Sequence, residues 1–293
     1  MKRSISHRNR ETQSALACWL RQAVGLVLLS GMLASGCSRT PQQAQPVDGQ
    51  AAPLRQLRIA AAASIRPALD EIIRSFQKHH DNVRVEVSYG SSGSHVAQLN
   101  NGAPFDMFLA ADMSYPQQLV DDGLAAEAAV FQYAVGRLVL WLSTRSAPND
   151  EAHQLNALLD PRVRRIAIAN PQHAPYGRAA VAAMQHCGIY EQVRNRLVLG
   201  ESIAHTAQLV ESGAADAGII ALSLIFVSPL RATGWHQEIA PEAYPPIEHG
   251  GVILSKARNA ELAIAFRDFL LSDEGQNILR AYRLAMRNSE AVD

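Results

Sequence analysis

The chain has 293 residues, 48% of them hydrophobic, and its 27 basic and 27 acidic side chains give a formal net charge of +0. A nucleic-acid-binding protein would carry an excess of basic side chains, so this balance excludes a nucleic-acid partner. The length exceeds what one hydrophobic core usually holds, and we therefore expect two lobes.

Residues 1–37 are predicted to be a signal peptide. Basic residues flank an apolar run over 23–34, which is too short to span a membrane. The run ends at Leu33-Ala34-Ser35-Gly36-Cys37, which resembles the lipobox of bacterial lipoproteins, where the cysteine is lipidated and becomes the new first residue. A lipid anchor on Cys37 is therefore expected, with a plain secretory signal as the alternative. Residues 38–53 are rich in Pro, Gln and Ala, a composition typical of a flexible tether.

Two strand-to-helix junctions come early in the chain. An apolar run over 57–63 predicts a buried strand that ends at Ser64, and a helix follows it. Valines alternate with polar residues over 83–88, which predicts a second strand ending at the turn Tyr89-Gly90-Ser91-Ser92-Gly93-Ser94-His95. Free N–H groups at a helix start and serine hydroxyls together form an anion site without lysine or arginine. The alternative is that Ser92 or Ser94 only caps its helix.

Two similar junctions follow in the second half of the chain. A strand over 165–170 leads into a helix that begins just beyond Tyr176, and a strand at 198–199 leads into a helix at Ile203. Further buried strands are predicted over 107–110, 138–142, 217–222 and 250–254. Strands that alternate with helices indicate open, mostly parallel α/β sheets, whose ligands bind beyond the carboxyl ends of the strands. The four junctions are therefore expected to converge.

An exported enzyme with Ser64 or Ser92 as its nucleophile is an alternative of another class. The sequence has no G-x-S-x-G elbow and no H-E-x-x-H motif, so we expect neither catalysis nor a cofactor.

Asp106 and Asp112 are expected to be turn and capping residues rather than metal ligands. Cys187 is expected to be a small buried residue on a helix. A sensor or adhesin that presents this domain to another protein is the third class.

Five blocks of sequence carry a resemblance to a known family. They are Ala61-Ala62-Ala63-Ser64, Tyr89-Gly90-Ser91-Ser92-Gly93-Ser94, Gly102-Ala103-Pro104-Phe105-Asp106-Met107-Phe108-Leu109-Ala110-Ala111-Asp112, Asn170-Pro171-Gln172-His173-Ala174-Pro175-Tyr176-Gly177 and Tyr244-Pro245-Pro246-Ile247. In their order and spacing they resemble the periplasmic molybdate-binding proteins of ABC importers. The likeness extends from Leu54 to about Tyr282.

The resemblance implies the two-lobed fold of type II periplasmic binding proteins, with helices on both faces of each sheet and a two-strand hinge. Lobe I would comprise residues 54–134 and 244–293, and lobe II residues 135–243. The implied function is capture of molybdate, and of tungstate, for delivery to an ABC transporter permease in the inner membrane. A receptor for another small oxyanion, such as sulfate or phosphate, is the alternative. The protein would be a periplasmic monomer, attached to a membrane only through the lipid on Cys37.

The resemblance also implies how the oxyanion is held. Carried over by position, Ser64 and Ser92 would bind molybdate through hydroxyl and backbone N–H groups, and Tyr176 and Ile203 through backbone N–H groups. Ala221 stands where some family members contribute a tyrosine hydroxyl, so that donor is either missing or supplied elsewhere, for example by Tyr176. Arg66 lies near the expected anion position, where it either points into solvent, which we favour, or adds charge to the site.

Overall fold

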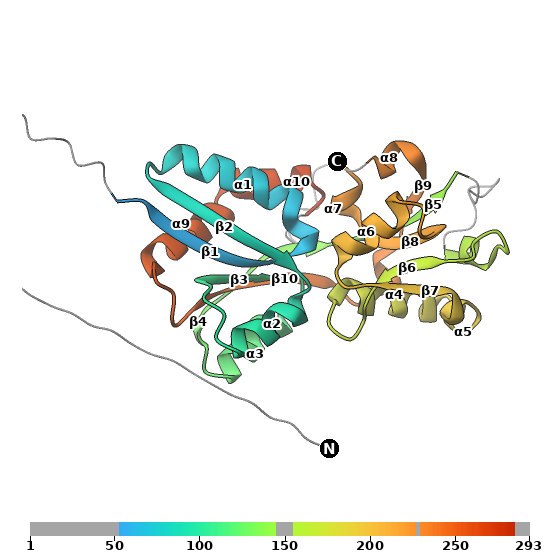
Figure 1. Cartoon of the computed structure of the whole chain (residues 1–293), viewed down its shortest axis with the longest axis horizontal. Helices are drawn as coiled ribbons and strands as arrows, with labels where there is room; N and C mark the ends of the chain where they lie inside the picture. Colours follow the sequence, from blue (N-terminus) through green and yellow to red (C-terminus); the bar gives the residue numbers. More distant parts are fainter. Residues whose placement is uncertain (1–52, 145–154, 227–228, 285–293) are drawn as a thin grey trace, which may run out of the picture. The chain divides into compact units, whose positions relative to one another are not determined.

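The computed structural model of the protein describes residues 53–144, 155–226 and 229–284. The predicted signal peptide, Cys37 and the tether up to residue 52 lie outside the described residues. The described part contains two five-stranded sheets, which we call sheet A and sheet B (Figure 1). Within the described ranges, no helix is both long enough and apolar enough to span a bilayer.

Sheet A contains the first strands of the chain and the last. Its order is β2 (Val83–Gly90), β1 (Arg55–Ala62), β3 (Met107–Ala110), β10 (Ile247–Leu254) and β4 (Ala125–Gly136). Strand β1 pairs in parallel with β2 and β3, whereas β10 is antiparallel to both β3 and β4. Four of the five strands therefore run in one direction, as expected for a mostly parallel sheet.

Helices cover both faces of sheet A because both sets of alternating side chains on β1 are apolar. One face packs against α1 (Arg66–His79), α9 (Ala260–Leu271) and α10 (Asp273–Ala281), and the other against α2 (Ser92–Asn100) and α3 (Ser114–Asp121). Ile59 and Ala61 belong to the first core, together with Phe76 of α1. Ala60 lies between them in sequence and belongs to the second core, with Leu99 of α2.

Sheet B repeats this arrangement in the middle of the chain. Its order is β7 (Leu197–Gly200), β6 (Ile166–Ala169), β8 (Ala217–Ala221), β5 (Leu138–Ser143) and β9 (Gly234–Glu238). Helix α6 (Ile203–Glu211) packs on one face, and α4 (Pro175–His186) on the other (Figure 1). Short helices and 3-10 turns complete the described part: η1 (Ala63–Ile65), η3 (Leu155–Leu159), α5 (Tyr190–Val193), η4 (Arg194–Arg196), α7 (Leu222–Ile225), α8 (Leu230–Thr233) and η5 (Pro241–Ala243).

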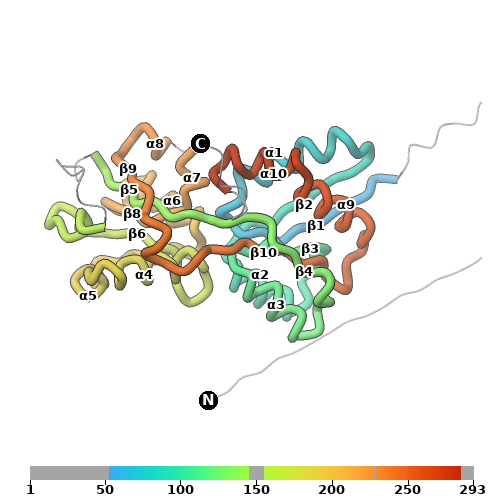
Figure 2. Tube along the Cα trace, turned by 180° about the vertical axis from the view of Figure 1, so that it is seen from behind, coloured from blue at the N-terminus to red at the C-terminus, as the bar shows by residue number. Residues whose placement is uncertain are grey.

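Two segments carry the chain between the sheets. Strand β4 continues into β5 through Arg137, and β9 returns to β10 over residues 239–246 (Figure 2). The two segments are joined because the N–H of Leu138 donates to Oη of Tyr244 at 3.0 Å. The lobe limits at 134/135 and 243/244 remain predictions.

One expectation about the core is wrong. Cys187 is exposed rather than buried. Helix α4 ends at His186, so Cys187 follows its last turn.

Candidate functional site

Four strand-to-helix junctions, two from each sheet, meet at one small cavity. The residues that line it are Ala62, Ala63, Ser64, Gly90, Ser91, Ser92, Ala111, Ala174, Pro175, Tyr176 and Ile203. The structure thus brings together the four residues that the resemblance assigned to the anion, although they are far apart in the sequence.

Ser64 presents a buried hydroxyl group to this cavity. It lies in η1 between β1 and α1, and the residue is 1% exposed. Its carbonyl oxygen accepts a hydrogen bond from Oγ of Ser223 at 2.7 Å, which fixes the turn. Its own Oγ has no hydrogen-bond partner among the described residues. A buried hydroxyl without a partner costs about 1–3 kcal/mol, so a ligand that accepts from it would recover that free energy.

Ser92 is the first residue of α2 and is also 1% exposed. Its Oγ accepts the N–H of Ala111 at 3.0 Å, which leaves the hydroxyl hydrogen available to a ligand. The helix cap is Ser91, whose Oγ accepts the N–H of Ser94 at 3.3 Å. The alternative in which Ser92 or Ser94 serves only as the cap is therefore wrong.

Helices α4 and α6 begin at the cavity from the side of sheet B. Pro175 is the first residue of α4 and has no N–H, so Tyr176 carries the first backbone donor of that helix. Ser202 caps α6 by accepting the N–H of His205 at 3.2 Å, and Ile203 is the first helical residue. The N–H groups of a first helical turn lack intrahelical partners and favour negative charge.

The cavity is polar without being charged. None of the described residues that line it is lysine, arginine, histidine, aspartate or glutamate. Its polar groups are serine hydroxyls and the backbone N–H groups at the N-termini of helices. This donor set suits a small anion that carries no hydrogen of its own.

Contacts between elements of the two sheets close around the cavity. The carbonyl oxygen of His173 accepts the N–H of Gly93 at 3.0 Å and Oη–H of Tyr115 at 3.3 Å. Arg178 of α4 donates to Oη of Tyr115 at 2.9 Å and forms an ion pair with Asp112. Neither Arg178 nor Tyr115 was predicted from the sequence, because neither belongs to a pattern that distinguishes it from an ordinary surface residue.

A second missed feature lies behind Tyr176. Its Oη is 3.2 Å from Nε2 of His249, a residue of β10 that is 0% exposed. Burial raises the pKa of Tyr176 and lowers that of His249 to about 3. His249 is therefore a neutral imidazole, and the sequence gives no signal for it because its nearest partner is 73 residues away.

Two residues of the predicted set lie outside the cavity. Ala221 ends β8, is 0% exposed and pairs with Leu138, so it contributes no surface to the site. Arg66 points away: its side chain is 60% exposed and lies 3.8 Å from Asp70. The interpretation of Arg66 as a solvated helix residue agrees with this position.

The two aspartates that raised the question of a metal serve local structure. The carboxylate of Asp106 accepts backbone N–H groups of Arg58 and Arg258 at 2.8 and 2.7 Å. Asp112 accepts the N–H of Ser114 at 2.8 Å, besides its ion pair with Arg178. Among the described residues, no group of three or more His, Cys, Asp or Glu side chains is placed to hold a metal ion.

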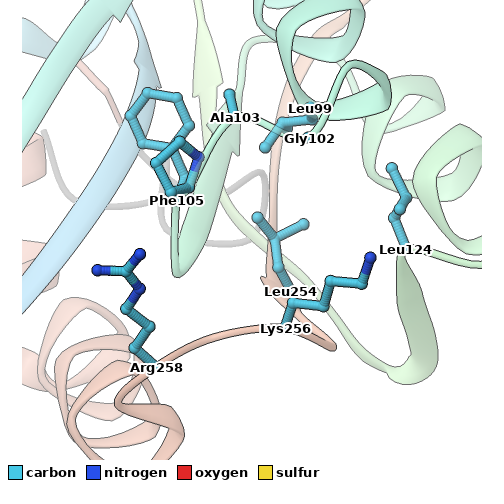
Figure 3. A pocket seen from close by; sticks show the side chains of 9 residues that line it. Leu99, Gly102, Ala103, Phe105, Leu124, Leu254, Lys256 and Arg258 are labelled. Atoms are coloured by element: carbon cyan, nitrogen blue, oxygen red, sulfur yellow. The ribbon is translucent and has the colours of Figure 1, made fainter.

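A larger cavity, of about 240 Å³, lies beside the start of β3 (Figure 3). Its walls include Leu99, Phe105 and Leu254, and Lys256 and Arg258 lie next to them. None of the residues predicted to hold the anion lines it. Anion binding there would depend on full cationic charges and so on salt, unlike binding to the small cavity.

Comparison with known proteins places this geometry among solute-binding proteins. A family model described as "Bacterial extracellular solute-binding protein" matches residues 57–282, a range that includes all four junctions. The molybdate-binding protein ModA of Azotobacter vinelandii is 34% identical over 234 residues, which cover 79% of this chain and 90% of that protein. ModA of Rhodobacter capsulatus is 34% identical over 223 residues, covering 76% of this chain and 85% of that protein.

A solved structure agrees with these matches. The Azotobacter vinelandii periplasmic molybdate-binding protein aligns with a TM-score of 0.72 and 31% sequence identity, covering 78% of this chain and 99% of that chain. The family resemblance inferred from the five sequence blocks and the two-lobed fold that it implied are both confirmed.

Proposed function

We propose, from the premise that this chain belongs to the bacterial extracellular solute-binding protein family, that it captures molybdate outside the cytoplasm. The family is one of solute-binding proteins, and two relatives that are 34% identical are named as molybdate-binding proteins. Capture rather than catalysis is the role that this relationship supports.

One observation carries the proposal. Four separate strand-to-helix junctions converge on one cavity whose lining, among the residues that the structure describes, offers hydrogen-bond donors and no charged side chain. Ser64, Ser92, Tyr176 and Ile203 surround the cavity from two sheets, so an anion between them would be bound by both lobes. Contacts such as Gly93 to His173 would then favour closure around the bound ligand.

The chemistry of the donors supports a fully deprotonated oxyanion. Hydrogen bonds to a charged group contribute about 1.5–3 kcal/mol each, and four to six of them reach about −8 to −12 kcal/mol after ordering costs. That range corresponds to micromolar to nanomolar dissociation constants. Hydrogen phosphate would bring its own hydroxyl hydrogen to a cavity that no carboxylate of the described part of the chain lines. Molybdate and tungstate bring no such hydrogen, and sulfate differs from them in size rather than in charge.

Delivery and attachment extend the proposal beyond the cavity. The loaded, closed protein would present molybdate or tungstate to an ABC transporter permease, acting as a periplasmic monomer. Cys37 would carry the lipid that holds it at the membrane. Replacing Cys37 with alanine should release the protein from the membrane fraction into the soluble fraction, and unchanged membrane association would refute the anchor.

A thermal melt with molybdate, tungstate, sulfate and phosphate in turn tests the function. A ligand at 100 times its dissociation constant adds about 2.7 kcal/mol of stability. For a protein of this size, that stabilisation raises the unfolding midpoint by about 5–10 °C. We expect this rise with molybdate and tungstate. A higher unfolding midpoint with sulfate or phosphate alone would assign capture to that anion instead. An unchanged midpoint with all four anions would contradict capture of an oxyanion.

A further inference from the structure

The phenol of Tyr176 lies where the two connections between the sheets run side by side. Its Oη is 3.2 Å from Nε2 of His249 on β10. Gly136, the last residue of β4, leaves the room that the phenol occupies, since a Cβ atom there would lie 2.1 Å from Oη of Tyr176 and 2.9 Å from Nε2 of His249. The absence of a side chain at Gly136 is therefore a requirement for this pair.

His249 has no freedom to turn away from Tyr176. The residue is fully buried, and its ring packs edge-on against the rings of Tyr133 and Tyr176, with centroids 5.6 and 6.0 Å apart. The Tyr133 hydroxyl donates to the carbonyl oxygen of Ala110 at 3.0 Å, which fixes that ring in turn. The imidazole is thus held between two aromatic side chains.

The partners of the imidazole decide where its hydrogen lies. Nδ1 of His249 has no hydrogen-bond partner among the described residues, whereas Nε2 faces Oη of Tyr176. Placing the hydrogen on Nε2 leaves Nδ1 as an unpaired acceptor rather than as a buried N–H without an acceptor. The phenol hydrogen that this arrangement releases would be accepted by an anion in the cavity, so in the loaded state the hydrogen belongs on Nε2. Nε2–H then donates to Oη of Tyr176. The phenol hydrogen is consequently free to be donated elsewhere.

The cavity is where that hydrogen can go. Tyr176 lines the cavity together with Ser64, and burial raises the pKa of the phenol while the Ser64 hydroxyl partly opposes this shift. The two side chains are therefore neighbours, although the two hydroxyl groups do not meet the geometry of a hydrogen bond, and the Ser64 hydroxyl has no hydrogen-bond partner among the described residues. An oxyanion next to Ser64 would lie within reach of the phenol as well.

We propose that His249 is a positioning residue that holds the Tyr176 hydroxyl as a side-chain donor to the bound oxyanion. The inference rests on the proposed function and adds a donor to the backbone N–H that the resemblance assigns to Tyr176. His249 does not touch the anion and acts only through Tyr176. The imidazole is neutral, which fits this role, because burial lowers its pKa by more than the nearby Asp112 carboxylate raises it.

The test is isothermal titration of the purified full chain with molybdate, and of four variants. Tyr176→Phe should bind about 10- to 100-fold more weakly, the range for one lost hydrogen bond to a charged group. His249→Met removes only the neutral bond that orients the phenol and should cost about 2- to 10-fold. His249→Gln restores an N–H near the Nε2 position and should recover most of that loss. The double variant, with Tyr176→Phe and His249→Met, should bind molybdate no more weakly than Tyr176→Phe alone, because both substitutions remove the same interaction with the anion.

Tyr282→Phe is the matched control, since the Tyr282 hydroxyl donates a hydrogen bond of 2.7 Å to Glu71, away from the cavity. It should leave molybdate affinity within about twofold of the original. Additive losses in the double variant, or full affinity in Tyr176→Phe, would overturn the inference while molybdate capture stands. If the unaltered protein binds no molybdate, the proposed function and the inference fail together.

Discussion

Replacing Ser64 with alanine should separate ligand binding from folding. Oγ of Ser64 is buried and has no partner among the described residues, so its removal takes nothing from the ligand-free fold. Loss of an unsatisfied hydroxyl should leave the free energy of unfolding unchanged or raise it by about 1 kcal/mol. Molybdate would lose one charge-assisted hydrogen bond, worth about 1.5–3 kcal/mol, and the dissociation constant should rise about 10- to 100-fold.

Two measurements on the same sample test this prediction. Chemical denaturation without ligand gives the free energy of unfolding, and isothermal titration with molybdate gives the affinity. Ser272→Ala is the matched control, because the Ser272 hydroxyl caps α10 by accepting the N–H of Gly275, away from the cavity. It should show the opposite result: about 1 kcal/mol lower stability with unchanged affinity. Unchanged molybdate affinity in Ser64→Ala would refute the reasoning.

Three further predictions concern closure, pH and salt. Gly93→Ala should weaken molybdate binding about 5- to 100-fold in a titration, because the new Cβ would lie 2.8 Å from Cβ of His173, just before α4; unchanged affinity would show that the contact between Gly93 and His173 does not accompany binding. The pKa of His249 is about 3 in the fold against an ordinary value of 6.5, so below pH 6.5 the unfolded chain binds a proton that the folded protein does not. Stability should therefore fall by about 2 kcal/mol between pH 7 and pH 5, seen as a lower unfolding midpoint, and His249→Gln should reduce that fall; an equal fall in that variant would assign it to other groups. Molybdate affinity should change little between low and moderate salt, because none of the described residues that line the cavity is charged, and a steep loss of affinity in titrations would point to a cationic site.

The elements that lead to the site were predictable because local patterns determine them. The apolar face of α1, formed by Leu69, Ile72, Ile73 and Phe76, is buried as the helical spacing predicts. The serines of the turn after β2 mark the start of helix α2. The convergence of four junctions followed from the general placement of ligands in open α/β sheets.

Other parts of the fold depend on partners that are distant in the sequence. Strand β4 begins Ala-Ala-Glu-Ala-Ala, which has no strand preference of its own, and it forms because β10 pairs with it from more than 100 residues away. The same applies to the site. His249 contacts Tyr176, and Arg178 contacts Asp112, each between elements of different sheets, and no local spacing marks those contacts.

A crystal structure with bound tungstate tests most directly whether the small cavity holds the oxyanion, because the anomalous scattering of tungsten identifies its position. The account predicts one strong anomalous peak in the small cavity, with its oxygens within hydrogen-bond distance of Oγ of Ser64 and Ser92 and of the backbone nitrogens of Tyr176 and Ile203. A peak beside Lys256 and Arg258 in the larger cavity, with the small cavity free of tungsten, would contradict it.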